Sequence, residues 1–234
     1  MQLETQTESI QTEVAREGGL IGLLDAFRQA EDTARVEAAV ATRAEWEQLV
    51  LVGVVGSAVF GIVTALFGMS PLQLLSSMLK LPVLIFATTV VCFPTFFVVQ
   101  YAFSPRPLSL HAAGLLQLKA VAITALSWAV ISLPLGILLA SARSYVTAKL
   151  LVTAVAAAGG TLGSLFLVRG FYSAASTSER TVSRWILILY CFLFGLVGSQ
   201  LAWNLRPFIG KPDEGFVLFR PLGGNLLEHL WRML

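Results

Sequence analysis

The feature that most constrains this chain is a long stretch without acidic residues. No Asp or Glu occurs from Gln48 to Ser178, although the 234-residue chain contains 14 acids. A soluble domain keeps its surface hydrated with about a quarter charged residues, whereas this chain is 13% charged and 56% hydrophobic. Such a stretch is typical of a protein whose outer face meets lipid, where helices satisfy their own backbone groups. We therefore expect an all-α polytopic transmembrane helix bundle.

The charges divide the chain into three parts. Residues 1–47 hold ten of the acids and four Arg, a net charge of −6, and the remainder carries +8. We expect an acidic soluble or amphipathic arm over 1–47, a transmembrane bundle over 48–206 and a tail over 207–234. The arm, with an apolar stripe from Leu20 to Ala30, is either a plain solvated helix or one that lies on the membrane, pairs with its own copy or docks a partner. The opening MQLETQTESI lacks the basic start and apolar core of a secretory signal peptide. No run of basic residues occurs, so nucleic-acid binding is not expected.

Hydropathy predicts five spans, near 49–67, 82–103, 120–142, 146–168 and 185–205. A four-span alternative, with one segment re-entrant, would bring both termini to the same side. Lys and Arg are almost evenly shared between the two sides, so the positive-inside rule does not set the orientation.

Short amphipathic segments lie between and after the spans. The segment Pro71–Lys80 puts Gln73, Ser76, Ser77 and Lys80 on one helical face, and it is too short to cross a bilayer core of about 30 Å. We interpret it as an interfacial helix, for which Gln73→Leu would be mild. Ser109 would cap a second interfacial helix ending at Lys119, and Asn225 with Glu228 predicts a third in the tail.

Aromatic and basic residues mark the expected membrane boundaries. Trp185 and Trp203 are eighteen residues apart, about 27 Å along a helix. We predict Trp46, Trp185, Trp203 and Arg206 as anchors at the membrane interface.

Small residues predict close helix packing. Gly159 and Gly163 form a G-x-x-x-G pattern, and Gly195 with Ser199 repeats the spacing. Such faces let helix backbones approach closely in lipid. They indicate packing within the chain, with the fourth span against the fifth as one arrangement, or a subunit interface. In both cases Gly163→Leu would disrupt packing.

The last span ends in SQLAWNLRP, where Gln200 and Asn204 share a face. Amides in a membrane helix usually hydrogen-bond across a helix interface. We read Gln200 first as an interhelical contact and second as part of a polar site.

No pattern indicates catalysis or a cofactor. The two histidines, His111 and His229, lie outside the expected spans, and Cys92 and Cys191 are isolated in apolar runs. We expect reduced thiols, no metal site, no cofactor and no enzymatic activity.

The segment QLAWNLRPFIG, Gln200 to Gly210, resembles the closing segment of a group of uncharacterised bacterial multi-pass membrane proteins, and the five-span outline is similar to Yip1-like proteins. The resemblance implies a bacterial cytoplasmic (inner) membrane location and no chemistry.

Two functions are compatible with these features. The first is a non-enzymatic membrane scaffold or subunit, assembling with its own copies or with other membrane proteins. The alternative is a pore or small-solute permease, supported by the polar faces of Gln100, Gln117, Gln200 and Asn204. A lipid-modifying enzyme comes last, because no catalytic constellation supports it.

Overall fold

The computed structural model describes residues 43–68, 70–103, 108–142, 144–173, 180–209 and 218, and for residues 103, 171–173 and 180–186 it describes the backbone alone. Residues 1–42 of the expected arm over 1–47, and nearly all of the tail, lie outside these residues. Within them the fold is helical, with no strand: α3 (Arg43–Ala65) continues as the short 3-10 turn η2 (Leu66–Gly68), and α4 (Pro71–Phe103), α5 (Leu110–Ser141), α6 (Tyr145–Ser173) and α7 (Arg180–Leu205) follow.

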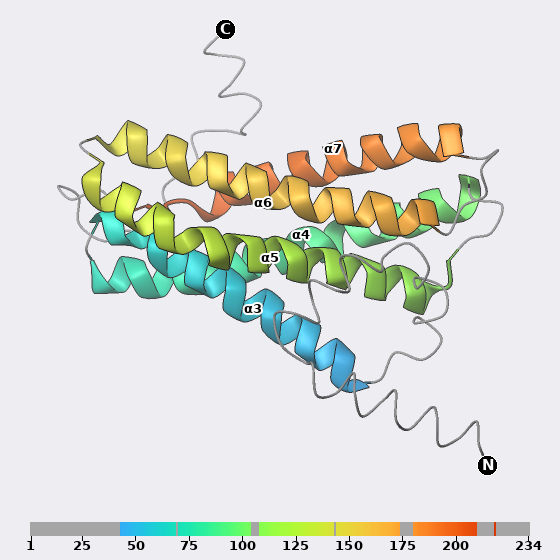
Figure 1. The fold of residues 1–234 in the computed structure, drawn as a ribbon, viewed down its shortest axis with the longest axis horizontal. Helices are drawn as coiled ribbons and strands as arrows, with labels where there is room; N and C mark the ends of the chain where they lie inside the picture. The colour runs from blue at the N-terminus through green and yellow to red at the C-terminus, as the bar shows by residue number, and fades with distance from the viewer. Residues whose placement is uncertain are drawn as a thin grey trace, which may run out of the picture.

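Five of these helical segments are long and apolar enough to cross a membrane. They cover Arg43–Gly68, Pro71–Ala102, Leu110–Ser141, Tyr145–Gly170 and Leu187–Leu205. The predicted all-α bundle is therefore confirmed, with five helices that are long and apolar enough to span a membrane. The chain runs back and forth along the long axis of the bundle (Figure 1).

Two predicted helix boundaries are wrong. The segment Pro71–Lys80 is not a separate interfacial helix, because α4 continues through Pro82 and Pro94 to Phe103. Ser109 is the N-cap, its side chain accepting from the Ala112 N–H, but the helix that it starts also runs on without a break to Ser141. Both predictions treated a polar residue near a span as the end of a helix. In the fold, packing against neighbouring helices keeps each segment helical beyond the span.

Helices α3, α4 and α5 pack through glycines of α3. A Cβ at Gly56 would lie 2.6 Å from the backbone oxygen of Ala125, and one at Gly61 would meet the backbone of Ser77. These contacts run α3 parallel to α5 and antiparallel to α4. This face was not predicted, although Gly53, Gly56, Gly61 and Thr64 recur at helical spacing and all are buried.

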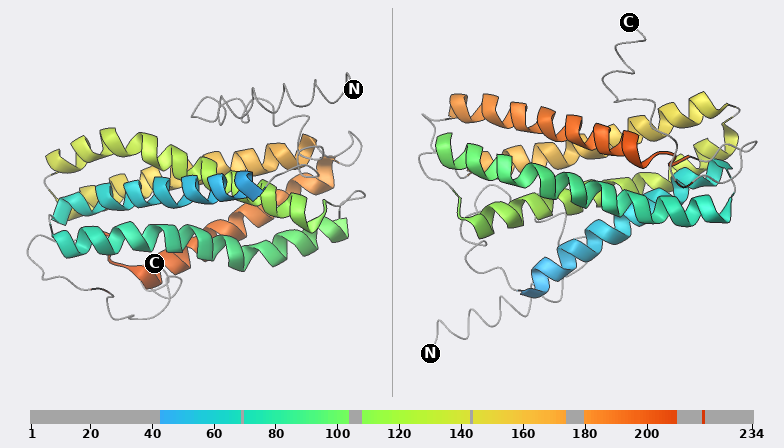
Figure 2. Two further views of the ribbon diagram at one scale, coloured as in Figure 1. Left: turned by 90° about the horizontal axis from the view of Figure 1, so that it is seen from below. Right: turned by 180° about the vertical axis from the view of Figure 1, so that it is seen from behind.

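The last two helices pack against different helices of the bundle. Helix α6 packs along α5, while α7 crosses α6 in projection and lies against α4 (Figures 1 and 2). The contact between Gly198 and Thr88 is one point where α7 meets α4. This arrangement brings the end of α7 beside the first turns of α4.

Candidate functional site

The polar face at the start of α4 is buried. Gln73, Ser76, Ser77 and Lys80 are 2%, 7%, 0% and 6% exposed, and we call them the α4 polar cluster. The interpretation of this face as one that meets headgroups is therefore wrong. The spacing of these residues showed that they share a face, but not that another part of the chain covers it.

The α4 polar cluster holds the backbone that follows α7. Gln73 Nε2 donates to the Pro207 carbonyl at 3.0 Å, and Ser77 Oγ donates to the Phe208 carbonyl at 2.6 Å. Lys80 Nζ donates to the Pro207 carbonyl at 3.3 Å and also to the Leu218 carbonyl. The last carbonyls of a helix, and those of irregular backbone after it, have no partner within the helix and need donors from elsewhere. Here side chains of α4 supply donors to the carbonyls just past the end of α7.

The irregular segment Arg206–Ile209, which we call the post-α7 segment, is packed into the bundle. Pro207 and Ile209 are buried, and Phe208 packs on the apolar cluster around Phe60 and Leu81. The Arg206–Pro207 peptide bond is cis. Gln73 also donates to Ser77 Oγ at 3.2 Å, which links two members of the cluster.

Two buried polar atoms near this contact have no hydrogen-bond partner among the described residues. They are Ser76 Oγ and Arg206 Nε. The Arg206 guanidinium lies over the Trp203 ring, with its carbon 3.6 Å from the ring centroid. The predicted anchors Trp203 and Arg206 are thus in contact with each other. Their role at a membrane interface stays a prediction.

Gln200 and Asn204 do share a face, as expected. Gln200 Nε2 lies 3.5 Å from Asn204 Oδ1 at an exposed position. Gly195 and Ser199 are exposed as well: a Cβ at Gly195 would have open space around it, and Ser199 Oγ donates to the Gly195 carbonyl on the same helix. The structure brings these four residues together on the outer side of α7. The hydrogen bond between Gln200 and Asn204 lies within α7, and the reading of Gln200 as an interhelical contact stays a prediction.

Gly159 and Gly163 belong to a different contact. A Cβ at Gly159 would meet the Trp128 ring, and one at Gly163 would lie 2.8 Å from the Ala120 carbonyl and also meet Thr124. These glycines pack α6 against α5. The prediction that this pair packs the fourth span on the fifth is therefore wrong. The structure shows that the pair packs the fourth span, α6, on the third, α5, within the same chain.

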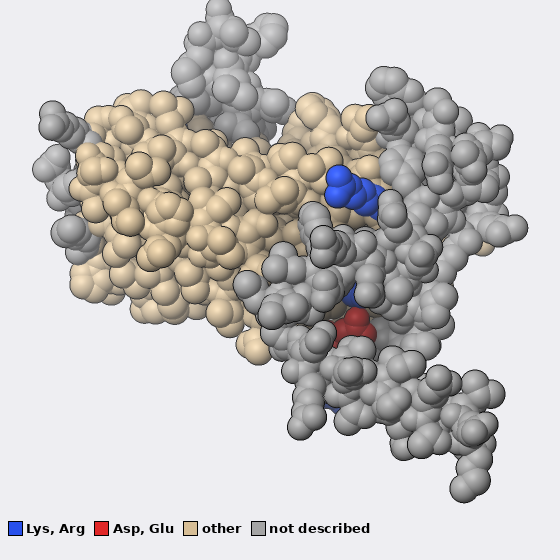
Figure 3. All heavy atoms as spheres, in the orientation of Figure 1, with Lys and Arg blue, Asp and Glu red and all other residues tan. Residues whose placement is uncertain are grey.

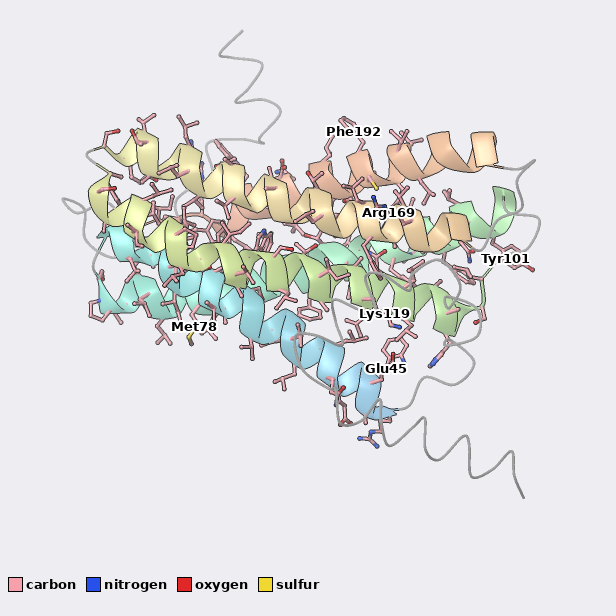
Figure 4. The ribbon with its side chains drawn as sticks, viewed as in Figure 1. Glu45, Met78, Tyr101, Lys119, Arg169 and Phe192 are labelled. Atoms are coloured by element: carbon pink, nitrogen blue, oxygen red, sulfur yellow. The ribbon has the colours of Figure 1, made fainter. Side chains whose placement is uncertain are left out.

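The opposite end of the bundle gathers charged and aromatic side chains. Trp46 Nε1 donates to His111 Nε2 at 3.3 Å, and Lys119 Nζ lies 3.3 Å from Glu45 Oε1. Figure 4 labels Glu45, Lys119 and Arg169 at this end. On the face in Figure 3, the rest of the described surface carries neither acidic nor basic side chains. Of the predicted anchors, Trp46 lies here, and the Trp185 side chain is outside the described residues.

The amides Gln100 and Gln117 are bonded inside the bundle. Gln100 accepts from the Leu108 N–H and donates to the Leu108 carbonyl, at 2.8 and 3.0 Å. Gln117 Oε1 accepts from the Tyr190 hydroxyl at 3.3 Å. These amides join neighbouring elements of the bundle.

The described residues contain no group of His, Cys, Asp and Glu side chains arranged to hold a metal ion. Cys92 and Cys191 are free thiols. No protein-family model, curated protein or solved structure matches the chain. The candidate site is therefore defined by geometry alone: the α4 polar cluster and the post-α7 segment.

Proposed function

We propose that this protein is a membrane permease for a small polar solute, with its binding site where the α4 polar cluster meets the post-α7 segment. The observation that carries the proposal is a buried lysine beside the irregular backbone that follows the end of α7, at membrane depth. Five apolar helices are compatible with an integral membrane protein, and the depth of the site follows from charges on α6.

The exposed charges of α6 mark an apolar layer. Lys149 and Arg169 are both exposed and twenty residues apart, which is about 30 Å along a helix. That distance equals the thickness of a bilayer hydrocarbon core. The two cations therefore fit the two edges of the core, with their stems reaching outward.

Contacts between helices show which residues of α7 and α4 lie at the same depth along the bundle as Arg169. A Cβ at Gly170 would meet Leu116 on α5, and the next residue, Gln117, accepts from Tyr190 on α7. The Tyr190 ring lies 5.0 Å from the ring of Phe96 on α4. Phe96 and Tyr190 therefore lie close to the level of Arg169.

The site lies inside the layer at the other edge. Lys80 is sixteen residues before Phe96 on α4, and Leu205 is fifteen residues after Tyr190 on α7. These spacings correspond to about 24 and 22 Å. Since Lys149 lies about 30 Å from Arg169, Lys80 and the end of α7 sit roughly 6–8 Å inside the level of Lys149.

Irregular backbone at membrane depth is tolerated where it is buried in protein or lines a polar cavity. An ionisable residue at that depth is a functional-site hypothesis by default. Transporters build substrate sites from interrupted helices and unwound carbonyls. Lys80 is such an ionisable residue, and the post-α7 carbonyls are such irregular backbone, with the unpartnered atoms of Ser76 and Arg206 close by in the chain. This combination supports a binding site over a purely structural contact.

The test is flux through proteoliposomes. Stopped-flow light scattering would follow swelling in iso-osmotic urea, glycerol, acetate and phosphate. We expect at least one solute to enter faster than in protein-free vesicles, and Lys80→Met to remove that excess. Lys149→Gln, an exposed cation on α6, is the matched control and keeps it. Equal swelling with wild type, Lys80→Met and empty vesicles for all four solutes would overturn the proposal.

A second function, assembly into a larger complex, is favoured by the outer face of α6. Its exposed residues include five small ones, Thr153, Ala154, Ala157, Ala158 and Thr161, and the open Gly195 and Ser199 lie on α7. Small residues facing outward allow another helix to pack closely. Native mass spectrometry from nanodiscs tests this function: Ala157→Leu should shift an oligomer toward monomer, whereas Val146→Leu at the edge should not. A monomeric wild-type protein with no co-purifying partner would contradict it.

A further inference from the structure

The site leaves two polar atoms without partners in a place where most polar atoms are paired. Ser76 Oγ, on a residue that is 7% exposed, and Arg206 Nε are buried and unbonded among the described residues. Buried side-chain polar atoms in native structures nearly always have a hydrogen-bond partner, and exceptions need an explanation such as an absent ligand. The two orphaned atoms border the same contact. Ser76 lies one turn before Lys80, and Arg206 directly precedes Pro207, whose carbonyl accepts from Gln73 and Lys80.

The chemistry of these atoms defines the missing partner. A guanidinium N–H only donates, so the partner of Arg206 Nε is an acceptor. The Ser76 hydroxyl can donate to an acceptor as well. Lys80, on the same face of α4 as Ser76, brings an ammonium group to the carbonyl of Pro207, the residue that follows Arg206.

The orientation of Arg206 suits an oxyanion. Its guanidinium lies over the Trp203 ring, 3.6 Å from the centroid, so one flat face is covered by the aromatic ring. The N–H bonds of a guanidinium point outward within its plane, in a fork that matches the two oxygens of a carboxylate or phosphate. Stacking therefore fixes the plane of Arg206, and the buried Nε–H in that plane is the donor without a partner.

We propose that Ser76, Lys80 and Arg206 form a binding site for a small oxyanion, a carboxylate or a phosphate group. As the substrate class of the permease this inference rests on the function proposed above, whereas binding itself can be measured without transport. The same oxygens are found on a soluble anion and on a lipid headgroup phosphate. The experiment separates these two sources.

Trp203 supplies the readout, because a ligand on Arg206 changes the surroundings of the ring beneath it. Protein in dodecyl maltoside micelles is titrated with sodium acetate and sodium phosphate, with sodium chloride as the ionic-strength control. We expect a saturable change in tryptophan fluorescence with acetate or phosphate that is absent in Trp203→Phe. Adding phosphatidylglycerol to the micelles forms the second arm. A saturable response to this lipid alone assigns the site to a headgroup, keeps the oxyanion site and removes it as the substrate site of the permease.

Variants then connect the signal to the site. Arg206→Gln should weaken binding at least tenfold, Arg206→Lys less than that because it keeps the charge but loses the fork, and Ser76→Ala about threefold. Lys149→Gln should bind as wild type does. Thermal unfolding shows whether each variant is folded. If Arg206→Gln does not fold, Arg206→Lys is used in its place. The inference is overturned if acetate, phosphate and phosphatidylglycerol all fail to give a saturable response. It is also overturned if the folded Arg206 and Ser76 variants bind with the same affinity as wild type. Solute flux without oxyanion binding would overturn the inference alone, and binding without flux would overturn the permease alone.

Discussion

Gly56→Ala should destabilise the bundle, because the backbones of α3 and α5 touch at this residue. The new Cβ would lie 2.6 Å from the Ala125 oxygen and 2.8 Å from the Ala125 carbonyl carbon. Both are backbone atoms within α5, so no side-chain rotation relieves the contact. An ordinary Cβ contact begins near 3.4 Å, so the helices must separate locally by 3.4 minus 2.6, about 0.8 Å. A gap of roughly that size forfeits a quarter to a half of the dispersion attraction across a packed contact.

The size of the effect follows from overpacking. Inserting a methyl group into a well-packed core typically costs about 1–3 kcal/mol. Replacing Gly with Ala in a helix also favours the helix by roughly 0.5–1 kcal/mol, which masks part of that cost. Gly195→Ala is the matched control, because the same substitution there meets open space. The difference between the two variants isolates the steric term.

The assay is thermal unfolding in one detergent, followed by circular dichroism. Gly56→Ala should unfold about 2–12 °C below Gly195→Ala, taking about 2–4 °C per kcal/mol for a chain of this size. Gly195→Ala should equal or exceed wild type. Equal transition temperatures for the two variants would refute the close α3–α5 contact on which this reasoning depends.

Other substitutions probe separate contacts by the same unfolding assay. Gly163→Leu should cost about 3 kcal/mol or more, because even its Cβ meets Thr124 and the Ala120 carbonyl; a variant as stable as wild type would show that α6 does not pack there. Gln73→Leu removes two buried hydrogen bonds, to Ser77 and to the Pro207 carbonyl, and should cost roughly 1–3 kcal/mol, whereas the interfacial interpretation expected a mild effect; Asn204→Leu at an exposed position is its control. Ser109→Ala removes the N-cap of α5 and should cost about 1 kcal/mol, with Ser109→Asn restoring most of it.

Helix boundaries show how far local sequence signals reach. Ser109 was recognised as a cap and is one, since a Ser before an apolar run offers its hydroxyl to a free N–H whatever the fold. The end predicted at Lys119 is wrong, because α5 continues to Ser141. Lys119 is partly buried and paired with Glu45 on α3. A basic residue inside an apolar pattern looks like a membrane edge, and only the neighbouring helix shows that it has a partner.

Glycine patterns show the same limit. The spacing of Gly159 and Gly163 predicted close packing within the chain, which the structure has, but not that Trp128 and Thr124 of α5 are the residues they meet. Gly195 and Ser199 have a similar spacing and face outward. The pattern identifies a surface that a helix can approach, and the partner depends on how the whole bundle is arranged.

The sequence by itself determined that this protein has long apolar helices suited to a membrane, and how many of them there are. The acid-free stretch from Gln48 to Ser178 and the length of each apolar run are local properties, and hydrophobic transfer and helix rise depend on little else. Only the tertiary structure shows which part of the chain the polar face at the start of α4 contacts. Gln73 and Lys80 donate to Pro207, more than 120 residues later in the chain, and periodicity in one segment carries no information about a partner that far away. The face expected to meet headgroups is buried, and a polar group taken out of water must find its partners within the protein. This burial is the reason why the face is the candidate site.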